Sequence, residues 1–324
     1  MKEAIFYVRN KEKWKQYEHC LKQSEKQSPD ALADIYIDLV NDLSFVRTHY
    51  PHSHLVLYLN GLSSKLHQFI NRKKTEKLSR FVHYWLYEVP ETMYDARKEL
   101  LVSFIIVIVS ALIGVYASAM DENYKSLILG NQYVEMTLDN IAADDPMAVY
   151  KDNDSYRMFF GITFNNIWVS FRAFIMGMLT SIGTAYVLFK NGVMLGCFHY
   201  MFYENGLMWD SFLTIWIHGS LEIPTMILDG AAGIALGNGW LFPKTYRRMD
   251  SFRIGARRGL KIIVGTIPFT ITAAFLESYL TRHTELPDLF RLLFILLAVG
   301  FAVFYFVIYP YRLHKKRTLQ TETL

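Results

Sequence analysis

Three ionisable side chains share one face of a long apolar segment between Ser211 and Gly237, and these residues are the best placed in the sequence to do chemistry. With about 100° of rotation per residue in an α-helix, Glu222 lies about 40° and Asp229 about 20° around from His218. A charged group at membrane depth costs ~2.5–3.5 kcal/mol on insertion scales, so such groups usually face protein partners. The pattern therefore predicts a polar stripe that faces the interior of a helical bundle.

Polar residues in neighbouring apolar segments lie at depths that match this stripe. Arg172 and His218 each lie seven residues into their segments, which favours an ion pair between Arg172 and Glu222. The same comparison favours a contact between His199 and Asp229. The predicted intramembrane polar cluster consists of Arg172, His199, Glu204, His218, Glu222 and Asp229.

Three interpretations of the stripe are open. A buried network could set the helix register, because intramembrane polar groups hydrogen-bond across helices for ~0.6 kcal/mol each. The stripe could instead line a transport or lipid-handling route, since ionisable residues beside a proline-broken helix are typical of such routes. The third interpretation is a metal-dependent or acid/base hydrolase. His218 and Glu222 could both bind a metal ion. The zinc-protease pattern, however, needs a second His and an adjacent Glu, and Gly219 follows His218 here. No catalytic residue and no organic cofactor are predicted.

Uncharged runs predict an all-α, polytopic transmembrane bundle with about six spans. The 21 residues of Leu100–Met120 carry no charge, and at ~1.5 Å per residue they can cross a ~30 Å hydrocarbon core. Further spans are expected at 165–189, 192–209, 211–237, 260–280 and 289–309. The stretch 192–209 is interrupted by polar residues, and a re-entrant hairpin is the alternative there.

The distribution of charge predicts how these spans are oriented. The loop 241–261 holds seven Lys or Arg, and the tail 312–324 is also basic. The loop 121–158 holds eight Asp or Glu against three Lys or Arg. Because cytoplasmic loops are enriched in Lys and Arg, we expect both termini in the cytoplasm and the acidic loop outside, in a multi-pass protein of the inner (cytoplasmic) cell membrane.

The first 99 residues carry charge throughout and predict a separate cytoplasmic domain. Ser28-Pro29-Asp30 has the form of a helix start, and leucines follow it at three- and four-residue spacing. We expect three or four amphipathic helices in domain 1–99, a transmembrane bundle at 100–311 and a basic tail at 312–324.

Composition excludes several classes of protein. The formal charge of +4 is small, and no stretch interleaves basic residues with aromatics on a polar background, so nucleic acid is not an expected partner. Cys20 and Cys197 provide neither a disulfide framework nor a thiolate metal cluster. The charged start of the chain predicts no cleavable signal peptide. An apolar content of 52% instead suggests a domain dissolved in lipid, so membrane lipids are expected partners.

Small residues recur at four-residue spacing in the second to fourth expected spans. They form the pairs Gly177 and Ser181, Gly192 and Gly196, and Gly233 and Gly237. Such pairs let helix backbones approach closely. They predict either a packed centre of three helices or a homodimer face.

Three blocks of this sequence together resemble the stage II sporulation protein M family. They are Lys190–Gly196, His218–Pro224 and Ala231–Gly237, and the head agrees through 32–36 and 50–60. By this resemblance the characteristic positions are Asn191, Gly192, Gly196, His218, Gly219, Glu222 and Gly233. The founding branch of the family acts as a membrane anchor or scaffold for peptidoglycan-degrading partners, and the resemblance assigns no catalytic role.

These observations lead to a first expectation of a membrane scaffold that recruits cytoplasmic or cell-envelope partner proteins. A transporter or lipid-handling protein is the alternative, and an intramembrane metal-dependent hydrolase is the third. If the protein is a scaffold, the polar stripe is a packing network. If it is a transporter, a lipid-handling protein or a hydrolase, the stripe is a ligand or metal site.

Overall fold

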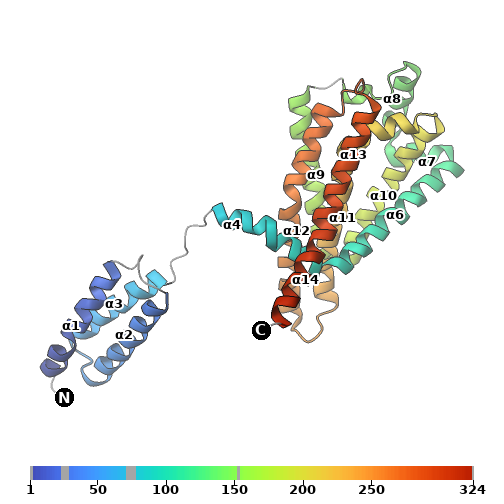
Figure 1. Ribbon diagram of the computed structural model, residues 1–324. Helices are drawn as coiled ribbons and strands as arrows, with labels where there is room; N and C mark the ends of the chain where they lie inside the picture. Colours follow the sequence, from blue (N-terminus) through green and yellow to red (C-terminus); the bar gives the residue numbers. More distant parts are fainter. Residues whose placement is uncertain (1–2, 23–28, 71–77, 152–153, 323–324) are drawn as a thin grey trace. The chain divides into compact units, whose positions relative to one another are not determined.

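Helices make up most of the part of the chain that the structure describes. A computed structural model describes residues 3–22, 29–70, 78–151 and 154–322, and these residues contain no β-strand. The all-α class predicted from the sequence is confirmed. The chain divides into two compact units, Met1–Lys77 and Leu78–Leu324 (Figure 1).

The first unit, called the head below, is a bundle of three helices. These are α1 (Glu3–Lys22), α2 (Pro29–His49) and α3 (His54–Ile70). The leucines spaced along α2 and α3 are buried together with two aromatic residues of α1, and the core consists of Phe6, Trp14, Leu32, Leu39, Leu43, Val46, Leu59, Leu62 and Leu66. Trp14 also donates a hydrogen bond from Nε1 to Asp42 Oδ2, at 2.7 Å. The head therefore has a hydrophobic core of its own.

The second unit begins before the charge-free run that starts at Leu100. It opens with α4 (Leu78–His83), a π-helical turn (Tyr84–Glu88) and α5 (Val89–Asp95). Val89, Met93 and Ala96 are buried against residues far along the chain, such as Leu228. Residues 78–99, which the charge pattern placed in the head, therefore pack with the apolar body.

The long helices of this unit run side by side (Figure 1). They are α6 (Arg97–Met120), α9 (Ser155–Met176), α10 (Ser181–Glu204), α11 (Met208–Leu241), α12 (Arg248–Phe275) with a π-helical extension (Leu276–Leu280), α13 (Asp288–Val303) with its own π-helical extension (Phe304–Ile308), and α14 (Tyr309–Glu322). Helix α11 is the central one, because it packs on α6, α9, α10, α12 and α13 and buries 21 of its 34 residues.

Three helical stretches of the described residues are long and apolar enough to cross a membrane. They are Arg97–Met120, Arg248–Leu280 and Asp288–Leu319. The sequence also predicted crossings by α9, α10 and α11, which lie beside those stretches, but their polar residues make them less apolar. Most residues of helix α11 are buried against other helices, which is where the polar residues of a membrane bundle usually lie.

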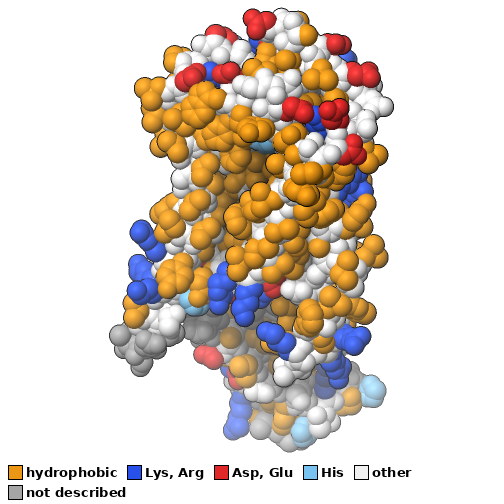
Figure 2. Space-filling model, turned by 90° about the vertical axis from the view of Figure 1, so that its right-hand side faces the viewer, with side chains coloured by type: hydrophobic (Ala, Val, Ile, Leu, Met, Phe, Trp, Pro, Cys, Tyr) orange, Lys and Arg blue, Asp and Glu red, His pale blue; other side chains and the backbone are white. Residues whose placement is uncertain are grey.

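The acidic segment expected to be a loop is largely helical and covers one end of the bundle. It contains α7 (Glu122–Leu129), α8 (Asn131–Ala142) and a 3-10 turn (Ala148–Tyr150). Val134, Met147 and Tyr150 form a buried cluster with Met201 and Phe202 of α10. In Figure 2 acidic side chains gather at one end of the face shown, next to a broad hydrophobic band, and basic side chains lie beyond that band.

Candidate functional site

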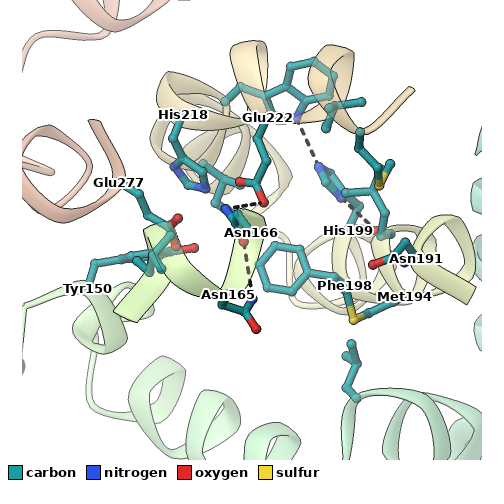
Figure 3. A pocket seen from close by; sticks show the side chains of 18 of the residues that line it. Tyr150, Asn165, Asn166, Asn191, Met194, Phe198, His199, His218, Glu222 and Glu277 are labelled. Carbon is teal, nitrogen blue, oxygen red and sulfur yellow. Dashed lines mark hydrogen bonds between the residues drawn. The ribbon is translucent and has the colours of Figure 1, made fainter. Parts of the chain in front are cut away.

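A pocket of about 580 Å³ lies along the polar face of α11. Helices α7 to α10, the turn at Tyr150 and the π-helical extension of α12 complete its wall. Most of its side chains are apolar, and the polar ones come from α9, α10, α11 and the extension of α12 (Figure 3). The lining residues are Leu129, Tyr133, Tyr150, Gly161, Ile162, Asn165, Asn166, Asn191, Met194, Leu195, Phe198, His199, Ile215, Trp216, His218, Gly219, Glu222, Ile223, Met226 and Glu277.

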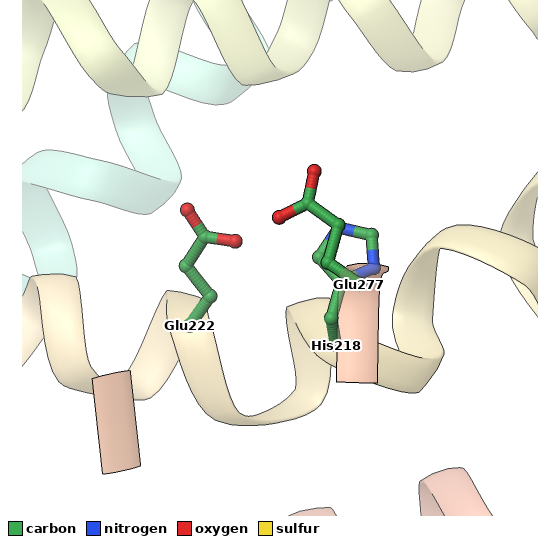
Figure 4. Close-up of side chains that lie close together, drawn as sticks. All are labelled: His218, Glu222 and Glu277. Atoms are coloured by element: carbon green, nitrogen blue, oxygen red, sulfur yellow. The ribbon is translucent and has the colours of Figure 1, made fainter. Parts of the chain in front are cut away.

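His218, Glu222 and Glu277 meet at one side of this pocket (Figure 4). One ligand atom from each lies within 4.8 Å of the others, so the three could hold a metal ion. His218 and Glu222 lie one turn apart on α11, and Glu277 comes from the π-helical extension of α12. His218 is only 5% exposed, and its Nδ1 lies 3.0 Å from Thr281 Oγ1.

Two further residues surround these three side chains. Asn166 of α9 donates a hydrogen bond from its side-chain nitrogen to Glu222 Oε1, at 3.1 Å. The ring of Tyr150 lies 6.0 Å from that of His218. Burial, and secondarily the carboxyl of Glu277, raises the pKa of Tyr150 well above 10. The hydroxyl of Tyr150 therefore stays protonated at neutral pH and can donate a hydrogen bond.

Asp229, the third member of the predicted stripe, lies deeper in the bundle. It is 2% exposed, and its Oδ1 accepts a hydrogen bond from Thr266 Oγ1 of α12, at 2.7 Å. A smaller cavity of about 150 Å³ has both Asp229 and Glu222 in its wall. The stripe therefore combines a satisfied carboxyl with a histidine and a glutamate that open to a larger pocket.

The structure does not form the pairs predicted across the helices. Arg172 is exposed and makes no ion pair with Glu222 among the described residues. His199 lines the pocket, but its Nε2 accepts from Trp216 Nε1 at 3.1 Å rather than contacting Asp229. Two residues at the same depth in neighbouring helices meet only if both side chains face the same interface, and depth does not fix which side of a helix a residue occupies.

Glu204 lies outside the site as well. It is exposed at the end of α10 and forms an ion pair with Lys125 of α7. The acidic segment folds back on α10, and that fold supplies the lysine. Glu204 therefore connects α10 to α7 of the acidic segment and does not belong to the buried cluster.

Sequence reasoning missed Glu277, Asn166 and Tyr150 as site residues. The only signal for Glu277 in the sequence is a carboxyl near the end of the otherwise apolar span expected at 260–280. Its relation to His218 appears only when α11 and α12 are packed together.

The paired small residues lie where helix backbones touch. A Cβ added to Gly192 would overlap Ser110 Oγ, and one added to Gly196 would overlap the carbonyl oxygen of Ala111 on α6. At Gly233 an added Cβ would lie 2.5 Å from the carbonyl oxygen of Ala173. These glycines therefore pack α6, α9, α10 and α11 within one chain.

The region that holds the site matches a family model described as Stage II sporulation protein M, over residues 103–282. The chain belongs to the stage II sporulation protein M family. The resemblance found in the sequence blocks is thereby confirmed, and the chain is a sporulation-related membrane protein. The matched region of this family contains the long helices α6 and α9 to α12 together with His218, Glu222 and Glu277.

A second family model, a domain of unknown function (DUF8413), matches residues 4–72. This match coincides with the head, whereas the stage II sporulation protein M match lies in the second unit. No curated protein and no solved structure matches the chain.

Proposed function

We propose that this member of the stage II sporulation protein M family binds an amphipathic ligand, such as a membrane lipid, in the pocket along α11. The observation that carries the proposal is a pocket of about 580 Å³ with apolar walls and a polar end formed by His218, Glu222 and Glu277. Ligand pockets have volumes of roughly 300–1,000 Å³ and combine apolar walls with a few polar groups. An acyl chain fits the walls, and a polar headgroup fits the end.

Gly219→Leu is expected to lower the amount of lipid that the purified chain retains at least about tenfold, which corresponds to about 1.4 kcal/mol. Gly219 lines the pocket, and a Cβ there would meet only Ile223 Cδ1, at 3.8 Å. The added side chain would therefore occupy the pocket without displacing a backbone. Native mass spectrometry of the protein in detergent measures the retained lipid.

The control is Gly300→Leu on α13, where an added Cβ has nothing within 4 Å. This variant should retain lipid like the parent chain. Equal retention by the Gly219→Leu variant, folded as judged by its thermal transition, would contradict the proposal.

The proposed topology has six crossings, with α9, α10 and α11 spanning beside the three apolar stretches. The acidic segment 121–158 lies outside the cell membrane, and the head, the basic loop 241–261 and the basic tail lie in the cytoplasm. In a chain without its two native cysteines, a membrane-impermeant maleimide should label Glu135→Cys on intact cells. Arg253→Cys should react only after permeabilisation. Labelling of both Glu135→Cys and Arg253→Cys on intact cells would contradict this topology.

A scaffold that recruits cytoplasmic or envelope proteins is the second candidate. The head has its own core and its own family match, which supports a module that could serve a separate purpose. Crosslinked capture from cells should then lose the same partners when the head is unfolded by Trp14→Ala. Capture that is unchanged by this variant would contradict recruitment through the head. A homodimer remains part of the same proposal.

A further inference from the structure

We propose that His218, Glu222 and Glu277 bind one divalent transition-metal ion, Zn²⁺ by their chemistry, at the polar end of the pocket. Nε2 of His218 and one carboxylate oxygen of each glutamate are the ligand atoms. The inference rests on the proposed function in one respect: the free coordination position of the ion is assigned to the polar group of the ligand in the pocket.

The donor set comes from two separate segments that the fold brings together. One candidate ligand atom of each residue, a ring nitrogen or a carboxylate oxygen, lies within 4.8 Å of those of the other two. Two ligands that are each about 2.1 Å from a tetrahedral ion are about 3.4 Å apart, so the atoms must move inward by at most about 1 Å. The two glutamate side chains can do this by rotation about their own bonds. His218 on the packed helix α11 is the fixed member of the set.

The hydrogen bonds around the three residues leave the required atoms free. Thr281 Oγ1 lies 3.0 Å from Nδ1 of His218, and a proton on Nδ1 leaves the lone pair on Nε2. Metal-bound histidines usually have their other nitrogen held in this way. Asn166 holds one oxygen of Glu222. Within the described part of the chain, the Glu277 carboxylate and Nε2 of His218 make no hydrogen bond.

The pair of carboxyl groups in the pocket also suits a cation. Two carboxyl groups lie side by side in a mostly apolar wall, and none of the described residues that line the pocket is a Lys or Arg. A carboxylate that is removed from water takes up a proton, or it is stabilised by a counter-charge or a metal ion. The exposed Arg172, the basic residue that the sequence offered, does not supply it.

The ligand types select the kind of ion. One imidazole suits Zn²⁺ and other first-row metals better than Mg²⁺ or Ca²⁺, which prefer six or more oxygen ligands. Three protein ligands leave a fourth position on Zn²⁺ open, as in zinc sites that bind a small molecule. That position faces the pocket, where it would take an anionic oxygen, such as one from a phosphate or carboxylate headgroup.

The full chain, purified in detergent and stripped with a chelator, should bind one Zn²⁺ per molecule in competition with a chromophoric chelator. Glu277→Gln and His218→Asn should each weaken binding at least about 100-fold. Thr281→Val should weaken it about tenfold, because it releases the imidazole without removing a ligand. Co²⁺ in place of Zn²⁺ should give visible absorption bands that Glu277→Gln alters.

The matched controls are His199→Asn, which changes a histidine in the same pocket, and Glu135→Gln, which changes a carboxyl in the acidic segment. Both should bind Zn²⁺ like the parent chain. Failure of the parent chain to bind Zn²⁺ at micromolar concentration, or binding that Glu277→Gln leaves unchanged, would overturn the inference.

The lipid measurement separates this inference from the proposed function. The chelator-stripped parent chain could retain lipid and fail to bind Zn²⁺, while Gly219→Leu loses the lipid. That result would contradict the metal site and support the lipid pocket. If the parent chain binds one Zn²⁺ and Gly219→Leu leaves lipid retention unchanged, the metal site is supported and the lipid pocket is contradicted.

Discussion

Gly196→Ala is expected to destabilise the membrane unit by more than about 3 kcal/mol, because overpacking at a backbone contact leaves no side chain that can move aside. The new Cβ would overlap the carbonyl oxygen of Ala111 and lie 2.9 Å from the backbone nitrogen of Val115, both on α6. Helices α6 and α10 would have to separate along their length. The thermal transition of the purified protein in detergent measures the loss.

Gly300→Ala is the matched control for this substitution. Gly300 also lies within a helix, but an added Cβ has nothing within 4 Å. Its expected effect is a gain of up to about 1 kcal/mol, because alanine favours the helical conformation more than glycine does. A transition for Gly196→Ala that matches that of Gly300→Ala would show that the two backbones do not touch in solution.

Trp14→Ala should unfold the head, at an expected cost of about 3–5 kcal/mol. The Trp14 side chain is 1% exposed, and its removal leaves a large cavity and an Asp42 carboxylate without its hydrogen-bond donor. A domain of this size has little stability to lose. Hydrogen exchange in the full chain should show loss of protection confined to the head.

Val8→Ala is the control on the same helix, since Val8 is 72% exposed. It should leave protection in the head unchanged. If Trp14→Ala instead exposed amides of α11 or α12, the two units would not be independent, and the division at Lys77 would need revision.

The sequence predicted the helices and the buried side of α11 but not the partners across the site. Periodicity along one helix shows which residues share a face, and Leu39, Leu59 and Leu66 of the head are buried as their spacing predicts. The depth of a residue in the membrane gives its position along the helix axis, but it does not give the direction of its side chain around that axis. Arg172 follows Asn166 by six residues, about 240° of rotation, so Asn166 faces Glu222 and Arg172 points away.

Only part of the candidate site could be predicted from the sequence, because spacing relates residues of one helix and not residues of different helices. His218 and Glu222 could be found from spacing because they lie on one helix. Glu277 lies 55 residues beyond Glu222, and only the packing of α11 on α12 brings the two together. A single sequence contains no periodic signal for such a contact. The pocket is lined by residues of seven separate segments, so its volume could not be predicted from the sequence either.

The burial of α11 has a consequence for how the protein is made. In the six-span arrangement proposed above, His218, Glu222 and Asp229 make this helix a poor candidate to enter lipid alone. Thr266 and Thr281, which bond to Asp229 and His218, are synthesised later, within and just beyond α12. The hydrogen bonds of Asp229 and His218 can therefore form only after α12 has been synthesised, whereas Asn166 of the earlier helix α9 is already available to Glu222. In this arrangement the polar face of α11 acquires its full set of partners only together with α12.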